Sequence, residues 1–102
     1  MKKNLKNIDV LRHFFNQKAA MSWTSNFSTC GKRLYSYDLE IARFDDEGDI
    51  VVFDYTAPAG CFESMTTSSH VGMVKREAPR RTTTIMRPAT AMVAGLIKTW
   101  GN

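Results

Sequence analysis

The sequence predicts an α+β domain: a three- to four-stranded antiparallel sheet with an N-terminal helix, a short helix after the sheet and a C-terminal helix, packed on one face. Three observations support this prediction: helical spacing of apolar residues near both termini, period-two alternation across residues 22–56, and an acidic loop containing Gly48 between two alternating runs. A chain of 102 residues holds one domain. Within it, residues 20–78 hold the sheet-containing core, and residues 79–102 form a basic connector and the C-terminal helix.

The N-terminal helix is predicted over residues 7–19. Ile8, Leu11 and Phe15 recur at helical spacing there, and Asn4 or Asn7 supplies an N-cap. The spacing places one apolar stripe toward the core.

The strands follow from alternation. Residues 22–28 alternate apolar and polar side chains before a turn that contains Gly31. From Arg33 onward one run places four apolar or aromatic residues on a single face, which predicts one half-buried strand with its tyrosines in the core. Those residues are Tyr35, Tyr37, Leu39 and Ile41.

The loop 45–49 has four acids, and Gly48 tolerates the positive φ that a short hairpin needs. It joins the preceding strand to residues 50–56, which are apolar on most of both faces and therefore predict an interior strand. A fourth short strand is predicted over residues 61–67.

Two helices are predicted in the C-terminal half. Hydroxyls at residues 66–69 cap a helix over 70–78 that stops at Pro79, and residues 80–87 form a basic, Thr-rich connector. Pro88 begins the C-terminal helix over 88–100. Its apolar stripe consists of Ala89, Met92, Val93, Leu96, Ile97 and Trp100.

Two motifs resemble a known family. The first runs Ser25-Asn26-Phe27-Ser28-Thr29-x-Gly31-x-x-Leu34-Tyr35-Ser36-Tyr37 and on to Ile41-Ala42-Arg43; the second is Thr66-Thr67-Ser68-Ser69-His70. Together they are similar to a family of small uncharacterised proteins of phages and mobile elements that share an SN-S-x-x-G-x-x-LYSY-x-x-x-IA stretch and a TTS-x-H segment. The resemblance covers about residues 22–78. It implies a protein that acts by binding a host or defence target, such as a CRISPR effector, in the host cytoplasm, and it brings no catalytic residues.

Charge is segregated along the chain. Residues 1–18 carry five Lys or Arg and one acid, residues 32–63 carry three against eight, and residues 75–102 carry six against one, for a net charge of +4. No apolar run is long enough for a membrane span or a signal peptide, so we expect a cytoplasmic protein without a membrane partner. Cys30 and Cys61 are too few for a disulfide scaffold.

The residues for catalysis and metal binding are sparse. His13, Cys30, Cys61 and His70 lack local zinc-ligand spacing, so no metal or other cofactor is expected. His70 could be combined on paper with either cysteine or with Ser68 or Ser69, but hydroxyls before a helix usually serve as caps. We therefore expect no enzymatic activity.

The basic connector is the main candidate binding site. Its donors, Lys75, Arg76, Arg80, Arg81 and Arg87, suit phosphates or an acidic protein surface. The three lysines at positions 2, 3 and 6 would join this cluster if the termini lie close together.

Tyr35 and Tyr37 are candidates for stacking on nucleic-acid bases, although their alternation is also typical of core residues. Ala94 and Gly95 are small residues of the predicted C-terminal helix that would permit close approach of a second copy. A homodimer through that helix is therefore an alternative to packing on the domain's own sheet. The leading hypothesis is a binding protein that inhibits or redirects a host or defence nucleoprotein complex. The alternative is direct, weakly sequence-selective binding of DNA or RNA.

Overall fold

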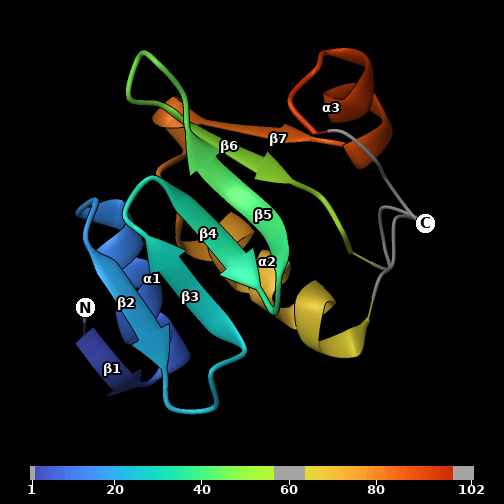
Figure 1. The fold of residues 1–102 in the computed structure, drawn as a ribbon. Helices are drawn as coiled ribbons and strands as arrows, with labels where there is room; N and C mark the ends of the chain where they lie inside the picture. Colours follow the sequence, from blue (N-terminus) through green and yellow to red (C-terminus); the bar gives the residue numbers. More distant parts are fainter. Residues whose placement is uncertain (1, 57–63, 98–102) are drawn as a thin grey trace.

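The computed structural model describes residues 2–56 and 64–97, which form one seven-stranded mixed sheet with helices (Figure 1). The elements in chain order are β1 (Lys2–Leu5), α1 (Asn7–Phe15), β2 (Ala19–Ser22), β3 (Phe27–Cys30), β4 (Arg33–Ser36), β5 (Leu39–Phe44), β6 (Ile50–Phe53), α2 (Met65–Glu77), the 3-10 helix η1 (Arg80–Thr82), β7 (Thr83–Met86) and α3 (Pro88–Val93). No helix in the described part of the chain is long and apolar enough to cross a membrane.

The strands lie in the sheet in sequence order. From β2 to β6 every neighbouring pair is antiparallel, but β1 pairs in parallel with β2, and β6 pairs in parallel with β7. The α+β class is confirmed, whereas the prediction of three or four antiparallel strands is wrong. The two edge strands escaped prediction because they are short and polar, and the sheet therefore extends on both sides of residues 20–78.

The long strand predicted from Arg33 onward is a tight hairpin. Ser36 pairs with Leu39, and the turn between them holds Tyr37 in the left-handed region at a φ of 56°. Because of this turn, the apolar positions before and after it do not lie on one face of the sheet. Tyr35 lies opposite Glu40 and shares no face with Leu39. Neither turn residue is a glycine or asparagine, and the usual hairpin signal is therefore missing.

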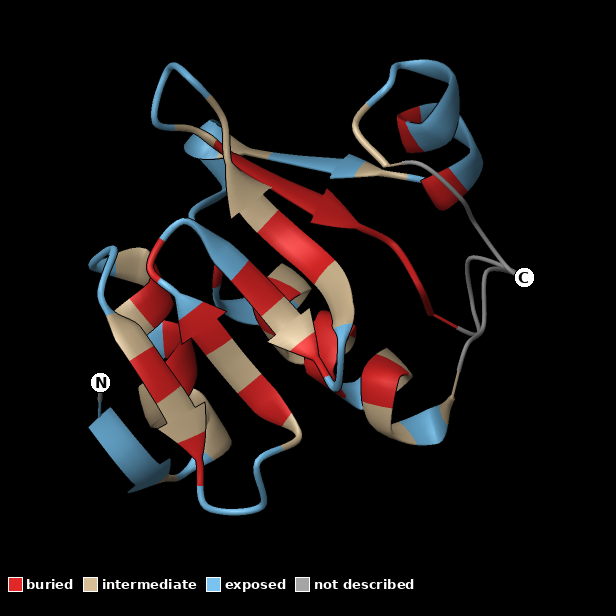
Figure 2. Cartoon of the chain, in the orientation of Figure 1, coloured by how far each residue is buried: buried red, intermediate tan, exposed pale blue. Residues whose placement is uncertain are grey.

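Helices α1 and α2 cover one face of the sheet (Figure 1). The Phe14 ring of α1 lies 4.9 Å from the ring of Phe44 in β5, and the His70 imidazole of α2 contacts Ser36 of β4. Between them lies the apolar core, and all four residues of β6 are buried (Figure 2). The prediction of helices packed on one face is confirmed for these two helices.

The segment after α3 reaches the opposite face. Arg43 alternates with Phe44, which faces α1, so the Arg43 side chain projects away from the helices. Its guanidinium donates a hydrogen bond of 2.6 Å to the backbone oxygen of Leu96. Leu96 and Ile97 are partly buried against the core, which fits their expected packing on the domain's own sheet.

Both C-terminal helices differ from their predicted limits. Helix α2 begins earlier, because the Ser64 hydroxyl accepts a hydrogen bond from the Thr67 amide and acts as the N-cap. Residues 65–67 are therefore helical and not part of a fourth strand, and residues 61–63 lie outside the described residues.

Helix α3 begins at Pro88 as predicted but ends at Val93, because the chain turns at Gly95 with a φ of 78°. The predicted stripe through position 100 does not form one helical face: Val93 is 87% exposed, and residues 98–102 lie outside the described residues. Residues 94–97 are not helical, so the long helix that the homodimer would require is interrupted there.

The acidic hairpin between β5 and β6 is confirmed. The Asp45 carboxylate accepts hydrogen bonds from the backbone amides of Glu47 and Asp49, and Gly48 has a φ of 83°. The side chain that begins this loop thus organises its backbone, while the other acids remain available to solvent.

Candidate binding sites at the two ends of the sheet

The antiparallel strands β2 to β6 follow one another along the chain, so the turns between them lie alternately at the two ends of the strands. One end, here called the charged end, holds the turns at residues 31–32 and 45–49 together with η1. The other end, here called the aromatic end, holds the turns at residues 23–26 and 37–38 together with the first turn of α2. The predicted binding residues are distributed unevenly between these two ends.

The basic cluster predicted from the sequence is only partly available. Lys75 donates to both carboxylate oxygens of Asp54, at 3.0 and 3.2 Å, and this Asp54 side chain is only 11% exposed. Lys75 therefore supports the interior strand β6 and is not a free phosphate donor. Arg76 is exposed and lies 3.7 Å from Glu77.

Arg80 and Arg81 are two of the exposed cations of the charged end. Both lie in η1, and neither forms an ion pair or hydrogen bond with any described side chain. Arg87 follows β7 at its far end, about 13 Å along the strand at 3.3 Å per residue. The structure therefore brings Arg76, Arg80 and Arg81 to one region and leaves Arg87 apart from them.

The N-terminal lysines do not join this cluster. Lys2 and Lys3 lie in β1, at the sheet edge opposite β7. Six strand spacings separate these edges, about 29 Å in a flat sheet. The condition under which the two basic segments would meet is therefore not fulfilled for Lys2 and Lys3.

An acidic loop adjoins the exposed arginines. Ile50 pairs with Thr83, so Asp49 and η1 enter neighbouring strands side by side (Figure 1). Asp46 and Glu47 are exposed in the same loop. The charged end therefore presents both signs of charge within one small area.

The two candidate stacking tyrosines are also separated. Tyr35 lies opposite Glu40, half-buried on the face away from α1 and α2, whereas Tyr37 is 55% exposed in the turn at the aromatic end. The core prediction fails for both, and a shared stacking surface does not form.

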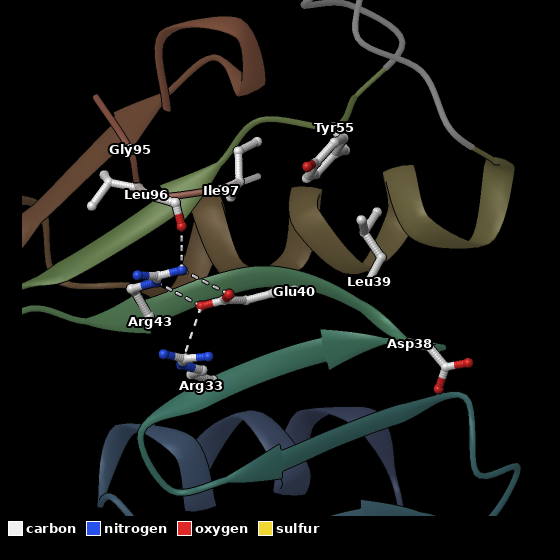
Figure 3. A pocket seen from close by; sticks show the side chains of 9 residues that line it. All are labelled: Arg33, Asp38, Leu39, Glu40, Arg43, Tyr55, Gly95, Leu96 and Ile97. Atoms are coloured by element: carbon white, nitrogen blue, oxygen red, sulfur yellow. Dashed lines mark hydrogen bonds and ion pairs between the residues drawn. The ribbon is translucent and has the colours of Figure 1, made fainter. Parts of the chain in front are cut away.

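A hollow of about 470 Å³ lies where the segment after α3 meets the sheet (Figure 3). Arg43 donates to both oxygens of Glu40, at 2.6 and 2.8 Å, and lies over the Phe53 ring at 5.4 Å. A second guanidinium, that of Arg33, approaches Glu40 to 3.8 Å. Because Arg43 also holds Leu96, these groups are engaged in attaching the C-terminal segment.

A buried polar network lies behind the aromatic end. The Ser36 hydroxyl lies 2.7 Å from Nδ1 of His70 and 2.9 Å from the hydroxyl of Thr67, and the His70 ring packs on Phe27 at 4.5 Å between ring centroids. His70 is 3% exposed, and burial lowers its pKa below the usual 6.5. The imidazole is therefore neutral at physiological pH.

The same network bears on catalysis. The structure joins His70 to Ser36 rather than to Ser68 or Ser69, and Ser36 is completely buried. A hydroxyl that solvent cannot reach is poorly placed to attack a substrate. Cys30 lies at the charged end, away from this histidine, and Cys61 lies outside the described residues. Among residues 2–56 and 64–97, no three His, Cys, Asp or Glu side chains form a potential metal site.

The two sequence motifs converge on this histidine. Phe27 and Ser36 come from the first motif, and Thr67 and His70 come from the second. Separations of 31 and 34 residues in the chain become contacts within one buried cluster. Ser36 and Arg43 also belong to the first motif, and their membership in it is the sequence signal that points to them as site residues.

Comparisons of the chain with protein-family models, curated proteins and solved structures returned no match. The case for function therefore depends on the geometry of the two ends of the sheet.

Proposed function

We propose that this chain is a non-catalytic binding protein whose charged end docks, through its exposed arginines, on a host or defence protein complex of the CRISPR-effector kind. The observation that carries the proposal is the pair Arg80 and Arg81, exposed in one short turn without an ion-pair partner among the described residues. Arginines of this kind are common anchors of protein interfaces.

The turn that carries these arginines is held in place before any partner binds. The Thr82 amide donates to the carbonyl of Pro79 at 3.3 Å, and the Thr83 hydroxyl donates to the same oxygen at 2.6 Å. The following residues pair with β6. Binding would therefore order two side chains and little backbone, which lowers its entropic cost.

The adjacent acids favour a protein partner over bare nucleic acid. A phosphate backbone that contacts η1 would also pass close to Asp46 and Glu47, and like charges would repel it. A protein surface can match cations and acids of both signs at separate points. Mixed charge at this end therefore supports protein docking.

Affinity capture from host lysate, with and without nuclease, tests the proposal. We expect the wild-type chain to retain a protein partner after nuclease treatment, and the R80E/R81E variant to lose it. The matched control is K2E/K3E, which reverses two exposed charges at the opposite edge of the sheet. Capture that disappears with nuclease would support direct nucleic-acid binding instead. Equal capture of a nuclease-resistant partner by wild type and R80E/R81E would contradict docking through the charged end.

A further inference from the structure

A second candidate site lies at the aromatic end, which is at the other end of the strands from the charged end. It is a pocket of about 420 Å³ whose lining includes Lys6, Trp23, Asn26, Thr66, Ser69 and His70. The described lining contains one cation and no carboxylate. The pocket therefore suits an anionic or polar ligand and offers no repulsion to a phosphate.

Trp23 gives this pocket a large flat surface. Its side chain is 70% exposed, yet its backbone amide donates to the carbonyl of Leu5 at 3.0 Å, which fixes the turn. An exposed indole on a fixed backbone costs free energy in water and gains free energy when a planar group stacks on it.

His70 contributes a prepared hydrogen-bonding group. Nδ1 is engaged with Ser36, and Phe27 packs against the ring, so the imidazole cannot turn freely. Its other nitrogen, Nε2, has no hydrogen-bond partner among the described residues, although the side chain lines the pocket. A neutral imidazole offers a base or sugar one further hydrogen bond, as donor or acceptor according to its tautomer.

The polar rim completes the arrangement. Lys6 is exposed and has no ion-pair partner among the described residues, and the pocket also takes hydroxyls from Thr66 and Ser69 of α2. An ammonium group and hydroxyls are common donors to phosphate oxygens.

We infer that the aromatic end binds a nucleoside phosphate unit of single-stranded nucleic acid, with its base stacked on Trp23 and its phosphate at Lys6. A single strand is favoured because bases in a duplex stack on one another and leave no face for the indole. The inference does not depend on protein docking at the charged end, because the two sites share no residue.

Tryptophan fluorescence tests this inference directly. The chain has two tryptophans, so the W100F variant leaves Trp23 as the only indole reporter. At low ionic strength it would be titrated with a short single-stranded oligonucleotide, the same oligonucleotide annealed to its complement, and adenosine monophosphate. We expect saturable quenching by the single strand, and a slope of log K against log salt of about −0.7 to −1.4 for one or two phosphate contacts.

Charge variants in the W100F background locate the site. We expect K6E to weaken the single-strand affinity about tenfold. K3E reverses an exposed lysine in the neighbouring edge strand β1, outside the pocket, and should change the affinity less than twofold. R80E/R81E should leave the titration unchanged, which separates this site from the docking surface. Equal affinity for adenosine monophosphate would identify a free nucleotide as the source of the ligand. Absence of quenching, equal binding of the duplex, or an unaffected K6E variant would overturn the inference.

Discussion

The charged end and the aromatic end of the sheet use polar residues in opposite ways. At the charged end the arginines of η1 extend into solvent beside an acidic loop, and little of the core depends on them. At the aromatic end the polar groups Ser36, Thr67 and His70 are buried beneath exposed aromatic residues. The adjacent arginines Arg80 and Arg81 are therefore a surface feature, whereas the polar groups buried at the aromatic end are two hydroxyls and one histidine that come from separate segments of the sequence.

The largest expected difference between the ends concerns stability. We expect His70→Ala to lower the free energy of unfolding by about 3 kcal/mol, because it leaves a cavity beside Phe27 and removes a partner of Ser36. Urea unfolding followed by circular dichroism measures the loss. His13→Ala, which removes a half-buried imidazole from α1, is the matched control and should cost less than about 1 kcal/mol. Similar losses in the free energy of unfolding for the two variants would show that the buried network around His70 contributes no more to stability than the half-buried His13.

The contacts of Arg43, on the face of the sheet away from α1 and α2, should make an intermediate contribution to stability. Arg43→Ala removes both hydrogen bonds to Glu40 and the bond to Leu96. The mostly buried Glu40 carboxylate then keeps only Arg33 as a cationic neighbour, at 3.8 Å. We expect a loss of about 2 kcal/mol and faster amide hydrogen exchange in residues 94–97. Arg33→Ala is the control, because its side chain is 51% exposed, and it should cost at most about 0.5 kcal/mol. An unchanged rate of amide hydrogen exchange in Arg43→Ala would mean that packing alone holds residues 94–97 against the sheet.

A smaller effect should appear as a pH dependence from the aromatic end. Burial lowers the pKa of His70 from 6.5, so below that pH the unfolded chain takes up a proton more readily than the folded one. Stability should be complete above pH 6.5 and fall as the pH drops toward the folded-state pKa, with a slope of at most about 1.4 kcal/mol per pH unit. Denaturant unfolding of the wild type and His70→Gln across this range measures it. An equal slope in both proteins would assign the effect to other groups.

The smallest effect on stability is expected at the charged end. Replacing Arg80 and Arg81 by alanine should change the free energy of unfolding by less than about 0.5 kcal/mol, because neither side chain has a partner among the described residues. The same urea measurement checks it. A loss above about 1 kcal/mol would show that these arginines support the fold, and would weaken their assignment to partner binding.

The parts of the fold that follow local rules could be predicted from the sequence. The amphipathic spacing of α1, the acidic hairpin with Gly48 and the start of α3 at Pro88 each depend on a few neighbouring residues. Strands β1 and β7 could not be found this way, because Lys2–Leu5 and Thr83–Met86 become strands only by pairing with a more apolar neighbour.

The candidate sites were less predictable for a related reason. The basic residues were visible as a cluster in the sequence, but Lys75 is occupied by Asp54, a partner 21 residues away. The pocket at the aromatic end combines residues from three segments that no local spacing connects. Trp23 belongs to residues 22–28, whose alternation predicts a strand, and only the turn at residues 23–26 accounts for its exposure.

The order of strands in the sheet has a consequence for folding. The antiparallel hairpins between β2 and β6 close over short turns, whereas the pairing of β7 with β6 joins Ile50 and Thr83, which are 33 positions apart in the sequence. The entropic cost of closing a loop rises with its length, and distant pairings form more slowly. We therefore expect β7 to join the sheet in the last folding step. Because η1 is placed by that strand, the arginines of the charged end reach their final positions only when the rest of the sheet is complete.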